Sequence, residues 1–113
     1  MASGFSIQLI SPMPGEVLEN GLILRIRAQI ILNCGIPVCA GGRWDPRRFR
    51  VQYRCLERDG VVSEGRLSFS GNTSEFLGES MLDGFGRYHL EITAWDPETG
   101  MAGRAGIDFS SRG

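Results

Sequence analysis

The chain contains no lysine: its basic residues are all arginine, and they nearly balance the acidic ones, leaving a net charge of -1. A charge this low excludes the basic footprint that binding to nucleic-acid phosphates needs, and it excludes polybasic attraction to a membrane surface. Arginine and glycine have GC-rich codons, and the chain has 16 glycines, so the composition indicates a GC-rich bacterial genome. We therefore expect a bacterial protein with no nucleic-acid partner.

The sequence also lacks a long hydrophobic run and a recognisable targeting segment. Its most apolar stretch, 22–32, is interrupted by Arg25, Arg27 and Gln29, whereas a membrane span needs about 18 apolar residues in succession. Residues 1–4 show none of the ordered charged and apolar regions of a signal peptide, and we interpret them as a linker or an added start on a fragment of a longer protein. We expect no direct membrane insertion.

Histidine and cysteine are scarce, which limits catalytic and metal chemistry. The one histidine, His89, is predicted on the outward face of a strand, and the sequence contains no nucleophile elbow and no phosphate-binding loop. We expect no catalytic residue, no enzyme activity and no cofactor. Three cysteines are an odd set, but a disulfide between Cys34 and Cys39 would pin the loop around them and indicate an oxidising compartment. Two reduced thiols, or a metal held by this pair with His89, remain open alternatives.

Period-two alternation of apolar and polar residues is the dominant pattern, and it predicts strands rather than helices. It is clearest over 48–56, where Phe49, Val51, Tyr53 and Cys55 share one face while arginines and a glutamine share the other. Turn dipeptides such as Asn-Gly and Asp-Gly separate the alternating runs. The predicted strands are 5–10, 22–32, 48–56, 61–69, 73–81, 87–95 and 101–109. The predicted domain covers 5–110, with a tail over 111–113.

Two segments resemble bacterial immunoglobulin-like domains. Residues 7–17, Ile-Gln-Leu-Ile-Ser-Pro-Met-Pro-Gly-Glu-Val, resemble the first strand and turn of such domains. Residues 82–96 are similar to their penultimate strand, because a glycine turn precedes an aromatic residue, alternating apolar residues and an acidic turn. The resemblance implies an all-β fold, a two-sheet antiparallel immunoglobulin-like β-sandwich of about seven strands without the inter-sheet disulfide of antibody domains. Tyr88 suits a tyrosine corner, with its hydroxyl reaching back to the preceding turn.

In that fold the loops 33–47 and 96–100 lie at the same end of the sandwich. We predict a binding surface there, formed by the four residues Arg43, Trp44, Asp96 and Glu98. An exposed tryptophan beside arginine is a common binding hot spot, although Trp44 can instead cap the core. The acidic residues are also explained as turn formers. A second candidate surface is the arginine stripe of strand 48–56, balanced by Glu91 and Asp108.

These features predict a non-catalytic module of a larger periplasmic or extracellular bacterial protein. Two packed sheets would hold the loops rigidly, so that the module serves as a spacer or as a docking domain for a protein or glycan. Its partners would include other domains of the parent protein. The alternative is a metal-binding accessory domain that uses Cys34, Cys39 and His89.

Overall fold

The computed structural model describes residues 5–19, 23–32, 49–57, 60–82, 84–98 and 100–112. These residues form nine strands and no helix, so none of them lies in a helix that could cross a membrane. The strands are β1 (Phe5–Ser11), β2 (Val17–Glu19), β3 (Ile23–Leu32), β4 (Arg50–Glu57), β5 (Gly60–Arg66), β6 (Ser68–Phe69), β7 (Glu75–Met81), β8 (Gly86–Trp95) and β9 (Ala102–Arg112).

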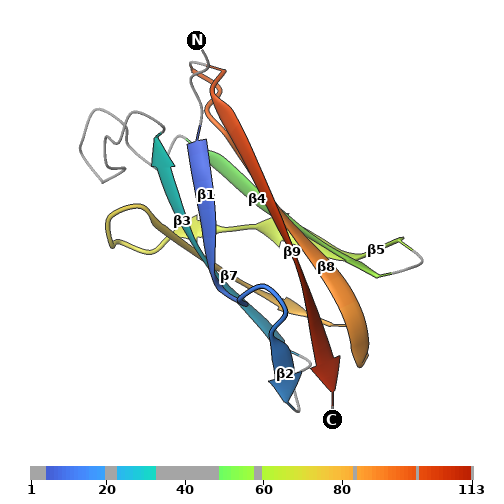
Figure 1. The fold of residues 1–113 in the computed structure, drawn as a ribbon. Helices are drawn as coiled ribbons and strands as arrows, with labels where there is room; N and C mark the ends of the chain where they lie inside the picture. Colours follow the sequence, from blue (N-terminus) through green and yellow to red (C-terminus); the bar gives the residue numbers. More distant parts are fainter. Residues whose placement is uncertain are drawn as a thin grey trace.

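The strands build two sheets that pack face to face, as Figure 1 shows. One sheet has four strands in the order β1-β3-β7-β6, and the other has five in the order β2-β9-β8-β4-β5. Neighbouring strands are antiparallel except for β2 and β9, which run parallel. The prediction of an all-β chain in two sheets is therefore confirmed.

The core forms because alternate side chains of both sheets point into the shared interior. On β4, Val51, Tyr53 and Cys55 are buried, while Gln52 and Arg54 between them are exposed. The same alternation buries one face of β3 and one face of β8, where Leu90 and Ile92 have no exposed surface. Each such aliphatic side chain contributes about 1.5–3 kcal/mol to folding. The predicted shared face of strand 48–56 is confirmed, and β3 and β8 follow the predicted period-two alternation.

Tyr88 closes the turn that precedes its own strand. Its ring is buried and stacks on Phe109 with 5.5 Å between the ring centroids. Its hydroxyl donates to the carbonyl oxygen of Gly84 and accepts a 3.1 Å hydrogen bond from the Gly84 backbone N–H. The predicted return of this hydroxyl to the preceding turn is confirmed.

The strand count differs from the expected seven for two reasons. Strand β2 is only three residues long, and the proline-rich sequence before it predicts a turn. The expected strand 61–69 is divided, because the chain leaves the five-stranded sheet after β5 and joins the four-stranded sheet at β6. Leu67 marks the crossing: it is buried, its N–H donates to the carbonyl of Val51 at 2.9 Å, and its side chain occupies the space left by Gly78.

The last strand runs past the expected domain end at residue 110. β9 continues to Arg112, Ser111 is buried, and residues 110–112 pair with β2. The Arg112 guanidinium binds the Glu19 carboxylate through Nε at 2.9 Å and Nη2 at 2.5 Å. Of the expected tail, Ser111 and Arg112 thus belong to the sheet.

The sandwich is elongated, measuring 44 × 27 × 20 Å. β1 begins at one end of the long axis, beside the turn between β8 and β9, and β9 ends at the other (Figure 1). We call these ends the N-terminal pole and the C-terminal pole. At the N-terminal pole the two sheets approach so closely that a side chain at Gly103 would overlap the carbonyl oxygen of Phe5.

Candidate functional site

The predicted binding surface is only partly within the described residues. Arg43, Trp44, Cys34 and Cys39 lie outside them, so their predicted roles stay predictions. Glu98 is exposed in the β8–β9 turn at the N-terminal pole.

Asp96 has a structural place in that turn. It has no exposed surface, and one of its carboxylate oxygens accepts the Glu98 N–H at 3.0 Å. Its backbone N–H donates to Met101 and its carbonyl accepts from Gly100, each at 2.8 Å. These bonds form a closed turn around a buried aspartate. The interpretation of Asp96 as a surface binding residue does not fit this burial, whereas the interpretation as a turn former does.

His89 lies on the outward face of the five-stranded sheet, between two carboxylates. Its Nδ1 is 2.8 Å from Asp108 Oδ1, and its Nε2 is 3.8 Å from Glu91 Oε2. The carboxylates approach different ring nitrogens, so the three groups do not converge on one point. Within the described ranges no three histidine, cysteine or acidic side chains are placed to hold a metal ion. Nothing in this part of the chain therefore favours the metal-binding alternative.

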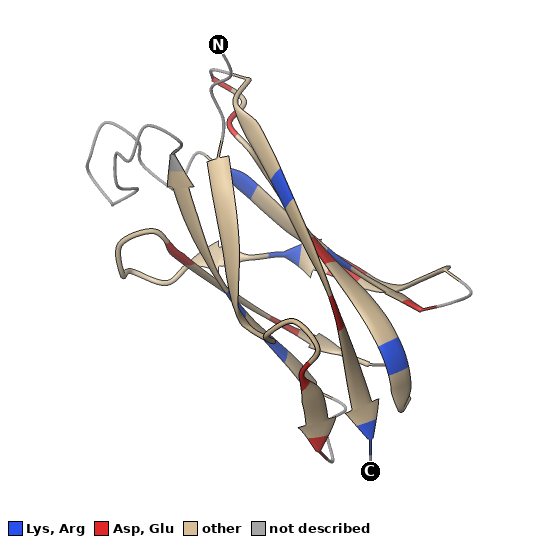
Figure 2. Cartoon of the chain, viewed as in Figure 1, with Lys and Arg blue, Asp and Glu red and all other residues tan. Residues whose placement is uncertain are grey.

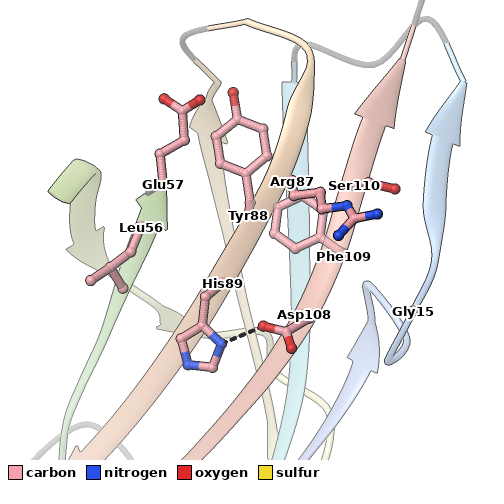
Figure 3. A pocket seen from close by; sticks show the side chains of 9 residues that line it. All are labelled: Gly15, Leu56, Glu57, Arg87, Tyr88, His89, Asp108, Phe109 and Ser110. Atoms are coloured by element: carbon pink, nitrogen blue, oxygen red, sulfur yellow. Dashed lines mark hydrogen bonds and ion pairs between the residues drawn. The ribbon is translucent and has the colours of Figure 1, made fainter. Parts of the chain in front are cut away.

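An open cavity of about 810 Å³ lies around this histidine, where β4, β8 and β9 run side by side (Figure 3). Figure 3 shows His89 and Asp108 joined across its lower end, with Arg87 and Ser110 further along the two strands. Among the described residues, no hydroxyl or thiol is hydrogen-bonded to His89. Within the described residues, this arrangement presents no activated nucleophile.

The third cysteine cannot take part in this chemistry. Cys55 is fully buried on the inward face of β4 and forms no disulfide. Burial, with a smaller contribution from the Glu57 charge, raises the pKa of the Cys55 thiol to about 11. A thiol with so high a pKa is neutral and unreactive near pH 7. The prediction that Cys55 points away from His89 is confirmed.

The outward face of the same sheet also carries a row of polar side chains that crosses four strands. Arg66 on β5 is the register partner of Gln52 on β4, Gln52 is the partner of Thr93 on β8, and Thr93 is the partner of Arg104 on β9. All four residues are exposed. The exposed indole of Trp95 lies two residues further along β8, in the next row toward the N-terminal pole.

Of the predicted arginine stripe, Arg54 is ion-paired within the described residues and Arg50 is not. Arg54 lies 3.8 Å from Glu64 and 4.0 Å from Glu91, so the predicted balance by Glu91 is confirmed. Asp108 pairs with His89 and not with an arginine. Arg50 is the register partner of Trp95 and has no ion pair within the described residues. The sequence pattern could place Arg50 and Trp95 on outward faces, but it could not place Arg66 and Arg104 beside them.

This geometry defines an all-β, two-sheet domain with one polar, ion-paired sheet face. No protein-family model matches the sequence, and no curated protein matches it. Among solved structures, the fold is similar to the 1.98 Å crystal structure of an engineered protein from the Northeast Structural Genomics Consortium, with a TM-score of 0.70 and 13% sequence identity. The match covers 96% of this chain and 20% of that chain. At this identity, the likeness shows the fold alone.

Proposed function

We propose that the chain is a non-catalytic immunoglobulin-like module of a larger bacterial extracytoplasmic protein, which acts as a spacer or as a docking domain for a protein or glycan. The observation that carries the proposal is where the first and the last described strands begin and end. β1 begins at one pole of a 44 Å long axis and β9 ends at the other, so neighbouring domains would be held apart by the full length of the sandwich.

The immunoglobulin-like assignment rests on strand order. In such domains strands A, B, E and D form one sheet, while G, F and C, with added strands, form the other. The orders β1-β3-β7-β6 and β2-β9-β8-β4-β5 correspond to these sheets when β1 is A, β3 is B, β4 is C, β8 is F and β9 is G. The bond between the Tyr88 hydroxyl and Gly84 supports the same assignment.

The distribution of reactive groups supports a non-catalytic role. Acid–base or nucleophilic catalysis needs groups that converge within hydrogen-bonding reach of one another. Here His89 lies on the outer face of the five-stranded sheet, while Cys55 is sealed in the interior. The partners proposed for the module are the other domains of its parent protein and a protein or glycan ligand, with no role in nucleic-acid binding or membrane insertion.

Small-angle scattering of two copies joined in tandem by a short linker tests the spacer geometry. If the ends lie at opposite poles, the maximum dimension of the tandem should exceed that of the single chain by about the 44 Å long axis of one module. The single chain at matched concentration is the control. If the maximum dimension of the tandem hardly exceeds that of one copy, the two ends of the module lie close together, and the spacer role is refuted.

A further inference from the structure

Four arginines on the outer face of the five-stranded sheet lack an acidic partner among the described residues. One of them, Arg87, lies toward the C-terminal pole, and the other three lie around Trp95. Elsewhere in the described sheets, Arg25, Arg27, Arg54 and Arg112 each lie within 4.0 Å of a glutamate. In contrast, Arg50, Arg66 and Arg104 make no ion pair in the described part of the chain. Figure 2 shows basic segments on β4 and β9, the two strands that flank β8, in the half of the molecule toward the N-terminal pole. Their charge is available to an anionic ligand.

These arginines surround an exposed aromatic ring. Trp95 is 46% exposed, and its neighbours across the strands are Arg50 on β4 and the small Ala102 on β9. The adjacent row places Arg66 and Arg104 at its two ends, with exposed Gln52 and Thr93 between them. Strand spacing makes this row roughly 14 Å long. We call these seven residues the Trp95 platform: Arg50, Gln52, Arg66, Thr93, Trp95, Ala102 and Arg104.

The backbone of β8, under the centre of the platform, has no free hydrogen bonds to offer. β8 is paired with β4 on one side and with β9 on the other, so a peptide cannot add a strand beside Trp95. Recognition beside Trp95 therefore uses side chains. The available groups are one flat indole, guanidinium forks that pair with carboxylates in a bidentate manner, an amide and a hydroxyl.

We propose that the Trp95 platform binds an acidic glycan, whose pyranose rings carry carboxylates. The apolar C–H face of a sugar ring would pack on the indole of Trp95, as apolar groups do on aromatic faces. Arg50 and Arg104 would bind the carboxylates, while Gln52 and Thr93 would exchange hydrogen bonds with hydroxyl groups. This inference rests on the proposed function, because it names the ligand class and the surface of a docking module.

The charges further along the sheet limit the length of the ligand. In the row of Arg54 the face carries Glu64 and Glu91, and one row further it carries Asp108. A long, densely charged polyanion such as a nucleic acid would meet these carboxylates and be repelled. The platform therefore suits an acidic stretch of a few sugar units that lies across the strands near the N-terminal pole.

Calorimetric titration of the whole chain with a galacturonic acid trimer tests the proposal. The matched control ligand is the methyl ester of the same trimer, which has the same rings but no carboxylate charge. We expect the acid to bind and the ester to bind at least about tenfold more weakly. Added salt should weaken binding of the acid, since the platform is exposed to solvent.

Substitutions inside and outside the Trp95 platform test where the acid binds. Trp95→Ala and Arg104→Gln should each weaken binding of the acid roughly tenfold, as loss of a hot-spot residue does. Arg87→Gln is the matched control: Arg87 is exposed on the same face of β8 toward the C-terminal pole and makes no ion pair among the described residues. It should bind the acid as the unmodified chain does. Thermal unfolding of each variant verifies that the fold persists.

Three results would overturn the proposal: no binding of the acid at millimolar concentration, unchanged binding by both Trp95→Ala and Arg104→Gln, or a polyglutamate peptide that binds as tightly as the sugar acid. The last result would indicate an acidic protein partner. The two proposals can fail separately. If the tandem is extended in scattering but the acid does not bind, the glycan proposal is rejected and the spacer role stands.

Discussion

At the scale of single residues, we expect the hydroxyl of Tyr88 to stabilise the turn between β7 and β8. Phenylalanine at this position keeps the ring that stacks on Phe109 but leaves the Gly84 N–H and carbonyl without their side-chain partner. We expect Tyr88→Phe to lower the free energy of unfolding by about 1–3 kcal/mol, measured by urea denaturation. Tyr53→Phe removes one 3.3 Å bond to the carbonyl of Glu79 and should cost less. Equal stability of Tyr88→Phe and the unmodified chain would contradict this role.

We predict that the Cys55 thiol reacts at different rates in the folded and the unfolded chain. With a pKa of about 11 and no exposed surface, the folded thiol is almost entirely protonated at pH 8 and shielded from reagents. Iodoacetamide should therefore modify Cys55 much more slowly in the folded chain than in urea, as peptide mass spectrometry would measure. Rapid labelling of Cys55 in the native state would show that β4 does not bury it.

We predict that protonation of Glu75 contributes to a loss of stability in acid. Hydrogen bonds from Ser70 and Asn72, together with the Arg27 charge, hold the pKa of Glu75 below its ordinary value of 4.5. A lowered pKa in the folded state means that the stabilisation is present above pH 4.5 and is lost as the pH falls through the folded-state pKa. In Glu75→Gln, the drop in unfolding free energy between pH 6 and pH 3, about the range of carboxylate titration, should be smaller. An identical drop in both proteins would contradict the assignment.

At the scale of elements, β9 contains two glycines that differ in the space available for a side chain. A methyl group at Gly103 would overlap the carbonyl oxygen of Phe5, which belongs to the backbone of β1 and cannot move aside. At Gly106 it would approach only the end of the His89 ring, with 3.0 Å to Nε2. We expect Gly103→Ala to cost about 1–3 kcal/mol in urea denaturation, whereas Gly106→Ala should stay within about 0.5 kcal/mol of the unmodified chain. Equal costs would show that β1 and β9 are further apart.

The strands that the sequence could predict are those long enough to show alternation. β3, β4 and β8 each extend over at least eight residues, and their inward faces follow from the pattern alone. β2 and β6 are three and two residues long, too short for a period to appear. Their positions depend on partners distant in the sequence, and β2 in particular pairs with the end of β9.

The candidate site was harder to predict than the fold, for two reasons. Asp96 lies in an acidic turn sequence that is compatible with two orientations of its side chain. The side chain could face water or accept backbone hydrogen bonds, and only the structure distinguishes the two. The polar row joins Arg66 to Arg104 across two intervening strands. Such a row depends on strand order and register, which alternation within a single strand does not contain.

At the scale of the whole molecule, the two poles differ in the interactions that their described residues make. The C-terminal pole ends in the β2–β9 pairing, where Glu19 and Arg112 join the two strands. The half toward the N-terminal pole carries the exposed Trp95 together with Arg50 and Arg104, which have no acidic partner among the described residues. We propose a spacer with a ligand surface on one sheet, close to one pole, because of this division.

The central claim is the register of the five-stranded sheet, because both the core and the Trp95 platform depend on it. Nuclear Overhauser contacts between backbone protons of opposing strands measure this register directly in solution. The structure predicts contacts that join Gln52 to Thr93 and Thr93 to Arg104. A register shifted by one residue would turn Trp95 into the core and Ala94 outward, and observing it would contradict the account.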